Sequence, residues 1–491
     1  MDKKIKTIEP KVIHHIPAEE NVRDDIHVVK ELITYEDGTT KRNLRLITNY
    51  KRPFWVTKEH YRNHKQKKES EELKKLNEYY CTQSDLAKET GMRLGIYGKK
   101  LTMRDTSRSP YLYGTDVDSR VFLKNHYISK YGNIFTPYTV CVLDTEVDIN
   151  TDELIIITVA MEGKSYTAIL YKLVEHTVDT ISQLNYLFKK HIPKTKLTED
   201  IQVEYGIFET EIELIQAAMS KVHEWQPDFL TMWNEVFDLN VMINVCNKFN
   251  VDPKYIFSDP SLPDNLKYFR FIEDKANKVT ASGVNKPPGP QERWHKVICP
   301  ASFYIVDAMC AYNYIRVGSK AVPGGYGLDS VLKNELGDNL KKLKFEDENT
   351  SKLIGVDWHR YMVSEKPLEY IIYNIWDVLS ILELDNITGD LKSSLPVLGG
   401  LSHFDNFKSG PKKIIDNILF FYKDTGRMLG CKDPLQEANS EIDLSDWIVM
   451  LPVYRSVDNG YKALLDVPNE HTNVKTHTFD SDKSKSAPNL K

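Results

Sequence analysis

Residues 142–147, with the sequence VLDTEV, decide the fold because two acids follow directly on an apolar strand. Side chains of a strand alternate between its two faces, so Asp144 and Glu146 point to the same side. Two like charges placed this close favour protonation of at least one carboxyl group, unless a divalent cation lies between them. A solvated turn, in which water screens both acids, is the alternative. The stretch alone therefore indicates either a metal site or an acidic turn.

A third acid, Asp238, follows another apolar strand. Residues 229–233 are predicted to form this strand, and a polar turn leads from it into a predicted helix over residues 238–249. Asp238 can act as the N-cap of that helix, or it can point inward as a ligand. The segment alone leaves both interpretations open, and the cap is the simpler one.

A fourth acid, Asp377, lies on the helix with the clearest pattern in the chain, predicted over residues 367–384. Tyr373 precedes it by four residues, so the two side chains share one face of the helix. A carboxylate that points from an apolar helix into the core needs a partner, either a metal ion or a buried arginine or lysine. The apolar residues around the pair are Leu368, Ile371, Ile372, Ile375, Leu379, Ile381 and Leu382.

The three patterns, Asp-x-Glu, Asn-x-x-Phe-Asp and Tyr-x-x-x-Asp, follow one another at intervals of about 90 and 140 residues. This order resembles the proofreading 3′–5′ exonuclease domain of family B DNA polymerases, in the DEDD group whose third motif carries a tyrosine. The resemblance is greatest to the replicative polymerases of large tailed phages, although Leu143 and Thr145 replace the usual phenylalanine and isoleucine. Two flanking segments also resemble the family: YGLDSVL at residues 326–332, and YGTDVD at residues 113–118, which RVFL follows at residues 120–123.

The resemblance implies a two-metal hydrolysis at the 3′ end of DNA. Asp144, Glu146, Asp238 and Asp377 would hold two Mg²⁺ or Mn²⁺ ions about 4 Å apart. One ion would bring the pKa of a water molecule into the reactive range, and the other would stabilise the leaving 3′ oxygen. Tyr373 would orient the attacking water, since an ordinary tyrosine pKa of ~10 makes it a poor base.

Two residues of the second motif are implied to contact DNA. Asn234 and Phe237 would seat the frayed 3′ strand, the aromatic ring by packing on a base or a sugar. Core packing is the alternative for Phe237. The hairpin predicted within residues 267–306 would separate the primer end from the template, a role that the family resemblance alone implies.

The polymerase palm of the family needs two further acids, in an Asp-x-x-Ser-Leu-Tyr-Pro-Ser segment and an Asp-Thr-Asp-Ser segment. GTDVDS at residues 114–119 is similar to the latter, but it precedes the exonuclease motifs, whereas the palm motif follows them. TFDSDKSKSAPN at residues 478–489 stands where the first palm segment would start, with Asp480 and Asp482 as candidate acids, but it lacks the Ser-Leu pair. Upstream, GYKALLD at residues 460–466 resembles the segment that leads into the palm.

Two classes of function follow from this pattern. In the first, the chain is the N-terminal subunit of a split replicative polymerase, which carries the exonuclease and pairs with a separately encoded palm, fingers and thumb subunit. Its partners would be primer–template DNA, that subunit and, through it, a sliding clamp and other replisome proteins. In the second, it is a free-standing 3′–5′ exonuclease or a non-catalytic DNA-binding remnant of a polymerase. The apolar residues within 447–465 favour the first, because an uncovered apolar strand invites a partner.

The composition excludes several classes of protein. Of 491 residues, 41% are hydrophobic and 27% are charged, which argues against a disordered chain, a collagen and a membrane protein. No apolar run approaches the ~20 residues of a spanning helix, and the N-terminus lacks the apolar core of a signal peptide. The six cysteines show no CxxC spacing. We therefore expect a cytoplasmic protein with reduced thiols, in the host cytoplasm if the chain is viral.

The predicted fold class is mixed α/β (α+β) with a ribonuclease-H-like exonuclease domain. Residues 1–137 are predicted to form a β-rich, DNA-contacting domain, residues 138–390 the exonuclease, and residues 391–491 a helical connector with an incomplete start of the palm and a polar tail. We expect a hairpin within residues 26–57 and a helix over residues 58–80.

Charge is unevenly divided along the chain. Residues 1–100 contain 22 Lys and Arg against 16 Asp and Glu, a net charge of +6, which leaves −11 for the remainder. A basic N-terminal part suits phosphate contacts, and an acidic remainder suits a carboxylate-rich metal site.

Overall fold

The computed structural model describes most of the first 431 residues and one hairpin beyond them. Two compact units divide the chain, Met1–Lys432 and Asp433–Lys491. In the second unit the described part is an antiparallel hairpin of β19 (Tyr454–Val457) and β20 (Gly460–Ala463). The rest of the predicted start of the palm, including Asp480, Asp482 and the polar tail, lies outside the described residues. These are 3–19, 22–98, 101–275, 278–279, 285–316, 322–345, 350, 353–407, 409–431, 454–457 and 460–463.

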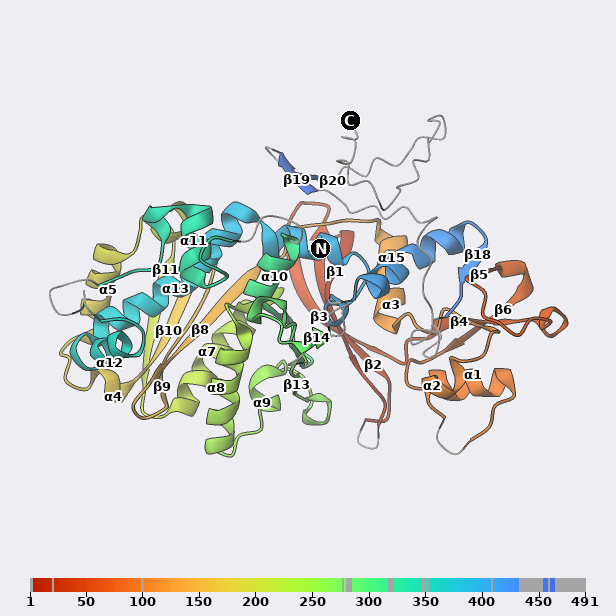
Figure 1. Cartoon of the computed structure of the whole chain (residues 1–491), viewed down its shortest axis with the longest axis horizontal. Coiled ribbons are helices and arrows are strands. Elements are labelled where there is room, and N and C mark those ends of the chain that lie inside the picture. The colour runs from red at the N-terminus through yellow and green to blue at the C-terminus, as the bar shows by residue number, and fades with distance from the viewer. Residues whose placement is uncertain are drawn as a thin grey trace. The chain divides into compact units, whose positions relative to one another are not determined.

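A mixed six-stranded sheet forms the core of the first unit, in the order β11-β10-β9-β8-β12-β17 (Figure 1). β9 runs antiparallel to both of its neighbours, whereas β8, β12 and β17 are parallel to one another, as are β10 and β11. The mixed α/β class is confirmed, and the sheet is consistent with an exonuclease domain of the ribonuclease-H-like type. The strands are β8 (Val140–Asp148), β9 (Glu153–Met161), β10 (Lys164–Leu170), β11 (Gln202–Phe208), β12 (Phe229–Met232) and β17 (Tyr304–Asp307).

The helices around the sheet start and stop at recognisable sequence signals. α7 begins with a capping box, in which Thr210 and Glu213 each accept a hydrogen bond from the other's backbone N–H, and it packs on β9 and β10. α13 begins at Pro367, ends before a left-handed Gly389, and packs on β8 and β9. The helices are α5 (Thr180–His191), α7 (Glu211–Trp225), α8 (Glu235–Lys248), α10 (Ala308–Ile315), α11 (Leu328–Leu336), α12 (Val356–Glu365) and α13 (Pro367–Thr388).

The N-terminal region is rich in strands, as predicted. β1 (Ile5–Ile16), β2 (Ile26–Tyr35) and β3 (Thr40–Thr48) form an antiparallel sheet, and the pairing of β2 with β3 confirms the expected hairpin. The apolar side of α3 (Ser119–Tyr131) packs on β1. The sheet and this helix therefore share one small apolar core.

The prediction of a helix over residues 58–80 is wrong. The segment contains β5 (Ser70–Glu72) and β6 (Leu76–Cys81), which pair with β18 (Arg427–Leu429) and β4 (Arg52–Thr57). The spacing of its charged residues suggested a helix, but pairing with distant strands overrides so weak a local preference.

The last segment of the first unit packs against residues of the N-terminal region. Leu419 of α15 (Gly410–Asp424) and Met428 of β18 share a buried apolar cluster with Trp55 and Tyr113. Segments assigned by sequence to the first and third domains thus pack together. The predicted boundaries after residues 137 and 390 stay predictions.

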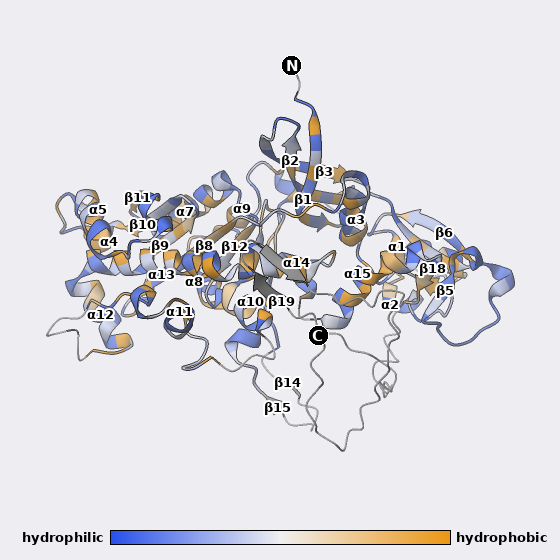
Figure 2. Cartoon of the chain, turned by 90° about the horizontal axis from the view of Figure 1, so that it is seen from above, coloured by the Kyte–Doolittle hydropathy of each residue, from blue (hydrophilic) through white to orange (hydrophobic). Residues whose placement is uncertain are grey.

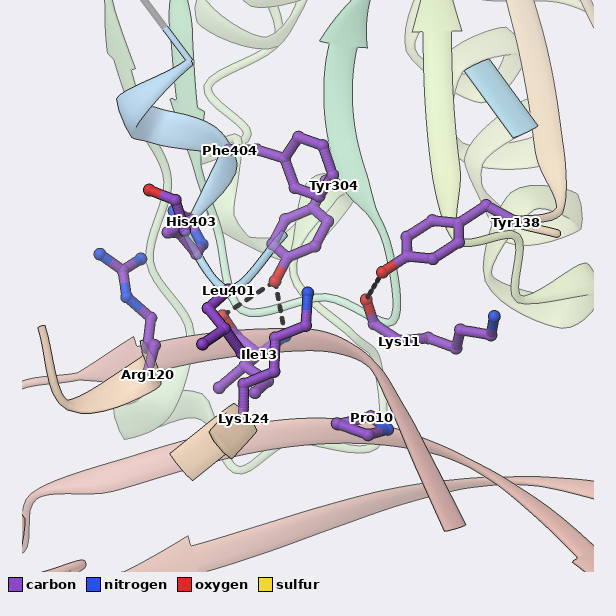
Figure 3. A pocket seen from close by; sticks show the side chains of 11 residues that line it. Pro10, Lys11, Ile13, Arg120, Lys124, Tyr138, Tyr304, Leu401, His403 and Phe404 are labelled. Atoms are coloured by element: carbon purple, nitrogen blue, oxygen red, sulfur yellow. Dashed lines mark hydrogen bonds between the residues drawn. The ribbon is translucent and has the colours of Figure 1, made fainter. Parts of the chain in front are cut away.

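A small pocket lies where β1 meets the central sheet (Figure 3). The Tyr304 hydroxyl of β17 accepts a hydrogen bond from Ile13 N at 2.7 Å, and the Tyr138 hydroxyl donates to Lys11 O at 3.0 Å. These contacts hold β1 against the sheet. The pocket has an empty volume of about 300 Å³ and is lined by none of the predicted site residues.

The helices carry both hydrophilic and hydrophobic residues (Figure 2). Within the described ranges, no helix combines the length and the apolarity that crossing a bilayer requires. All six cysteines are buried free thiols, in agreement with the expected reduced state.

Candidate functional site

Three of the four predicted metal ligands converge in the first unit. Asp144 and Glu146 lie on β8, and Asp377 lies on the buried face of α13 that packs against this strand. One carboxylate oxygen of each lies within 4.8 Å of the other two. The turn interpretation of the first motif is wrong, because both acids are inside the strand rather than after it.

The fourth acid, Asp238, is tied to the same strand from α8. Its Oδ1 accepts hydrogen bonds from the backbone N–H of Thr145 at 3.0 Å and from the Thr145 hydroxyl at 2.6 Å. Thr145 stands between Asp144 and Glu146, so this contact places Asp238 beside the acidic cluster. The N-cap interpretation of Asp238 is wrong, because α8 starts three residues earlier, after Asn234.

The buried carboxylate of Asp307 fixes the start of α8. Asn234 adopts a left-handed backbone conformation with φ of 72°, which turns the chain from β12 into the helix. The next residue, Glu235, donates its backbone N–H to Asp307 Oδ2 at 2.8 Å, and Asp307 Oδ1 accepts from Cys310 N at 2.8 Å. Asp307 thus caps α10 and holds the first turn of α8, which carries Asp238.

One face of α13 meets the acids through several side chains. Asn374 donates from Nδ2 to Asp144 Oδ2 at 2.6 Å, and the Tyr370 hydroxyl donates to Glu146 Oε2 at 2.5 Å. Tyr370, Asn374 and Asp377 are spaced by four and three residues, so they lie along a single stripe of the helix. Tyr373 lies on the same face, with its ring stacked on that of Tyr370.

Lys342 is a site residue that the sequence did not reveal. Its Nζ lies 2.6 Å from Asp377 Oδ2 and donates to the Tyr373 hydroxyl at 3.0 Å. Asp377 therefore has the lysine partner that was the alternative to a metal ion. Its second oxygen, Oδ1, is buried with no hydrogen-bond partner among the described residues, so the lysine leaves a ligand atom free. Nothing in the KKLK sequence at residues 341–344 distinguishes this lysine from its neighbours.

His359 of α12 forms an outer contact of the site. Its Nδ1 lies 2.8 Å from the Tyr370 hydroxyl and 4.0 Å from Glu146 Oε2. The neighbouring Trp358 packs its ring near that of Tyr373. The sequence pattern did not indicate α12, because the apolar residues of this segment do not follow a regular helical spacing.

The acids repel one another in the absence of a cation. Burial, and then the nearby Asp238 and Glu146, raise the pKa of Asp144 well above its ordinary value. Burial raises the pKa of Glu146 to about 7, despite the hydrogen bond from Tyr370, and that of Asp238 to about 7, despite those from Thr145. Burial also raises the pKa of Asp377, although Lys342 acts against it. The cluster therefore favours neutralisation, by protons or by cations.

The donor set fits a hard divalent cation. All four candidate ligands offer carboxylate oxygens, which Mg²⁺ and Mn²⁺ prefer. The orphaned Oδ1 of Asp377 and the raised carboxyl pKa values show that the site lacks positive charge even with Lys342 in place. The residues present thus suit the metals that the sequence implies.

The two predicted DNA contacts differ in exposure. The Phe237 side chain is 52% exposed, so the core-packing alternative is wrong. Asn234 is half-buried at the turn before α8. Trp233 donates from its indole N–H to Tyr326 O at 3.0 Å, which joins this turn to the YGLDSVL segment. An exposed aromatic ring one residue from Asp238 suits contact with an unpaired nucleotide.

Comparison with known proteins shows one similarity, which covers part of the chain. Residues 119–284 match the family described as DNA polymerase family B, exonuclease domain. The search of curated proteins found no match. The matched range contains Asp144, Glu146 and Asp238, whereas Tyr373 and Asp377 lie beyond it. The match supports a family B DNA polymerase exonuclease domain.

Proposed function

We propose that the chain is a two-metal 3′–5′ DNA exonuclease that proofreads for a family B replicative DNA polymerase. One observation carries the proposal: Asp144, Glu146 and Asp377 place carboxylate oxygens within 4.8 Å of one another, although 233 residues separate the first from the last. Chance proximity of three acids, one buried and two half-buried, is costly, because each like charge raises the energy of the others. A shared cation site removes this cost.

The metal ligands proposed are Asp144, Glu146, Asp238 and Asp377. Two Mg²⁺ or Mn²⁺ ions, when bound, would activate the attacking water and stabilise the charge on the leaving 3′ oxygen. The chain's own contribution is to hold the four carboxylates in place, through the side chains of Thr145, Tyr370, Asn374 and Lys342.

Tyr373 is proposed to orient the attacking water. Burial, and then the charge of Asp377, raise its pKa above the ordinary value, so the hydroxyl keeps its proton at neutral pH. A neutral hydroxyl can donate one hydrogen bond and accept another, which suits positioning rather than proton abstraction. Lys342, which donates to this hydroxyl, fixes its direction. Asn234 and Phe237 are proposed to seat the 3′ strand.

The test is the release of nucleotides from DNA labelled at its 5′ end. Purified chain with Mg²⁺ should shorten single-stranded DNA from the 3′ end and release mononucleotides. Asp144→Asn with Glu146→Gln should lose nearly all of this rate while still binding DNA, and the exposed Asp200→Asn should lose none. A double variant as active as the control would refute the metal assignment.

A second, more specific proposal rests on the sequence: the chain is one subunit of a split polymerase. We propose that a separately encoded chain supplies palm, fingers and thumb, that it links this chain to a sliding clamp, and that both act in the cytoplasm. Polymerase activity should appear only when the two chains are mixed. Deletion of residues 441–491 should abolish co-purification and spare the exonuclease, whose proposed ligands all precede residue 378. Nucleotide addition by this chain alone would contradict the proposal.

A further inference from the structure

A second cluster of metal-ligating side chains lies in the N-terminal sheet, apart from the exonuclease acids. It consists of His15 on β1, Asp25 just before β2, and His27 on β2. One potential ligand atom of each lies within 4.8 Å of the other two. All three belong to the first compact unit.

The strand register brings these residues together. His15 and His27 are direct cross-strand partners in the antiparallel pairing of β1 with β2, so their side chains share one face. Asp25 precedes His27 by two residues and points to that same face. The two imidazole rings have centroids 4.8 Å apart.

His27 carries an orphaned nitrogen. The side chain is fully buried, and its Nδ1 has no hydrogen-bond partner among the described residues. Its Nε2 lies 2.8 Å from the hydroxyl oxygen of Ser119, at the start of α3. With Nε2–H donating to Ser119, Nδ1 keeps a lone pair, which is the form in which imidazole binds a metal.

Burial and a hydrogen bond from outside the cluster hold Asp25 in place. Asp25 is 1% exposed, and its Oδ2 accepts from the backbone N–H of Ser84 at 2.8 Å. Its Oδ1 lies 2.5 Å from His15 Nε2. The His15 side chain is 13% exposed, which leaves a path for an ion from solvent.

We propose that His15, Asp25 and His27 bind one divalent transition-metal ion of the Zn²⁺ class. Imidazole nitrogens select Zn²⁺ and its neighbours over Mg²⁺, and two histidines with one carboxylate leave a position open for water. Ligand atoms around tetrahedral Zn²⁺ lie about 2 Å from the ion, and therefore about 3.3 Å from one another. The short His15–Asp25 hydrogen bond is exchanged for bonds to the ion.

The proposed role is structural. The ion would join β1 to β2 directly. Through Ser119 and Ser84 it would also fix the start of α3 and the turn before α1 (Leu86–Leu94). The site does not depend on the exonuclease function proposed above.

The test measures Zn²⁺ binding to the full chain after removal of bound metal. Asp144→Asn with Glu146→Gln serves as the parent, so that the exonuclease acids do not contribute. The parent should bind one Zn²⁺ per chain in the presence of excess Mg²⁺, and Co²⁺ in its place should give the visible absorption of a four-coordinate site. A parent that binds no Zn²⁺, or that loses it to Mg²⁺, overturns the proposal.

Variants then assign the ligands. His27→Gln and His15→Gln in the parent should each weaken Zn²⁺ binding at least 100-fold, whereas His126→Gln, an exposed histidine of α3, should bind as the parent does. Because a buried histidine can matter for folding, Ser119→Ala provides a milder change: loss of the outer hydrogen bond should weaken Zn²⁺ binding about tenfold. Equal affinity in the parent and in both histidine variants overturns the assignment, whatever their stability.

Discussion

Lys342 places a positive charge directly against the acidic site. Burial alone would lower its pKa, but Asp377 and Tyr373 outweigh that effect and raise it well above the ordinary value, so the amine stays protonated. It binds one oxygen of Asp377 and leaves the other free. The lysine therefore orients Asp377 and Tyr373, but its single charge does not neutralise all of the clustered carboxylates.

Lys342→Met should reduce the rate of exonuclease turnover about 100-fold, a loss typical of removing one oriented donor from a site where charge develops. Its neighbour Lys341 provides the control, since the Lys341 amine is half-exposed and faces Asp338 at 3.9 Å. Steady-state rates of nucleotide release at saturating Mg²⁺ separate the two variants. If Lys342→Met is as active as Lys341→Met, the lysine has no role in the reaction.

At the scale of the element, α13 supplies a single stripe of side chains to the acids on β8. Tyr370 holds Glu146, Asn374 holds Asp144, and Asp377 joins the cluster. The stripe explains why a largely apolar helix tolerates these three residues, because Tyr370 and Asn374 have partners on β8 and Asp377 pairs with Lys342.

Tyr370→Phe tests this stripe with little change in packing. It removes a hydrogen bond to an ionised carboxylate, which contributes about 1.5–3 kcal/mol, and leaves Glu146 free to turn. We expect the Mg²⁺ concentration for half-maximal activity to rise about tenfold. Tyr138→Phe removes another buried hydroxyl, the donor to Lys11 O, and should cost about 1 kcal/mol of stability with no change in Mg²⁺ dependence. An unchanged Mg²⁺ requirement in Tyr370→Phe would show that Glu146 needs no such anchor.

The sequence predicted elements whose pattern is local and continuous. α13 was placed from its many apolar residues around Tyr373 and Asp377, and it extends four residues beyond the predicted end at residue 384. The helix over residues 58–80 failed because β5 and β6 are stabilised by partners distant in the sequence. The family motifs indicated all four acids, but Lys342 and His359 act through tertiary contacts that leave no periodic pattern in the sequence.

Over the whole first unit, buried charges connect the N-terminal region to later segments. Lys30 of β2 pairs with Asp228, just before β12, at 2.7 Å. Arg120 of α3 pairs with Asp118 at 2.8 Å and with Asp405 at 3.3 Å. Removal of one member of such a network leaves its partners buried and uncompensated.

Arg120→Gln should therefore lower the free energy of unfolding by about 3–5 kcal/mol at pH 7. Burial raises the pKa of Asp118, but Arg120 lowers it by more. Burial also raises the pKa of Asp405, but His403 and Arg120 together lower it by more. The folded pKa values lie below the unfolded value of ~3.9, so this stabilisation is present above about pH 4 and is lost as the pH falls further.

Urea unfolding of both proteins between pH 7 and pH 3 measures this dependence. The difference in the free energy of unfolding between the unmutated chain and Arg120→Gln should become smaller below about pH 4. Arg93→Gln, which removes an exposed pair with Glu89 at 3.8 Å, should cost at most about 1 kcal/mol at any pH. If the difference in the free energy of unfolding does not change with pH, Arg120 does not lower the pKa values of Asp118 and Asp405.

The central claim is that acids from three separate segments form one exonuclease site, and Asp377→Asn tests it most directly. Asp377 lies outside the range that matches the polymerase exonuclease family, so only the packing of α13 on β8 connects it to Asp144 and Glu146. The measurement is single-turnover release of the 3′-terminal nucleotide from single-stranded DNA at saturating Mg²⁺. The account predicts a rate at least about 100-fold below that of the unmutated chain, with DNA binding retained. An unchanged rate of release would contradict it.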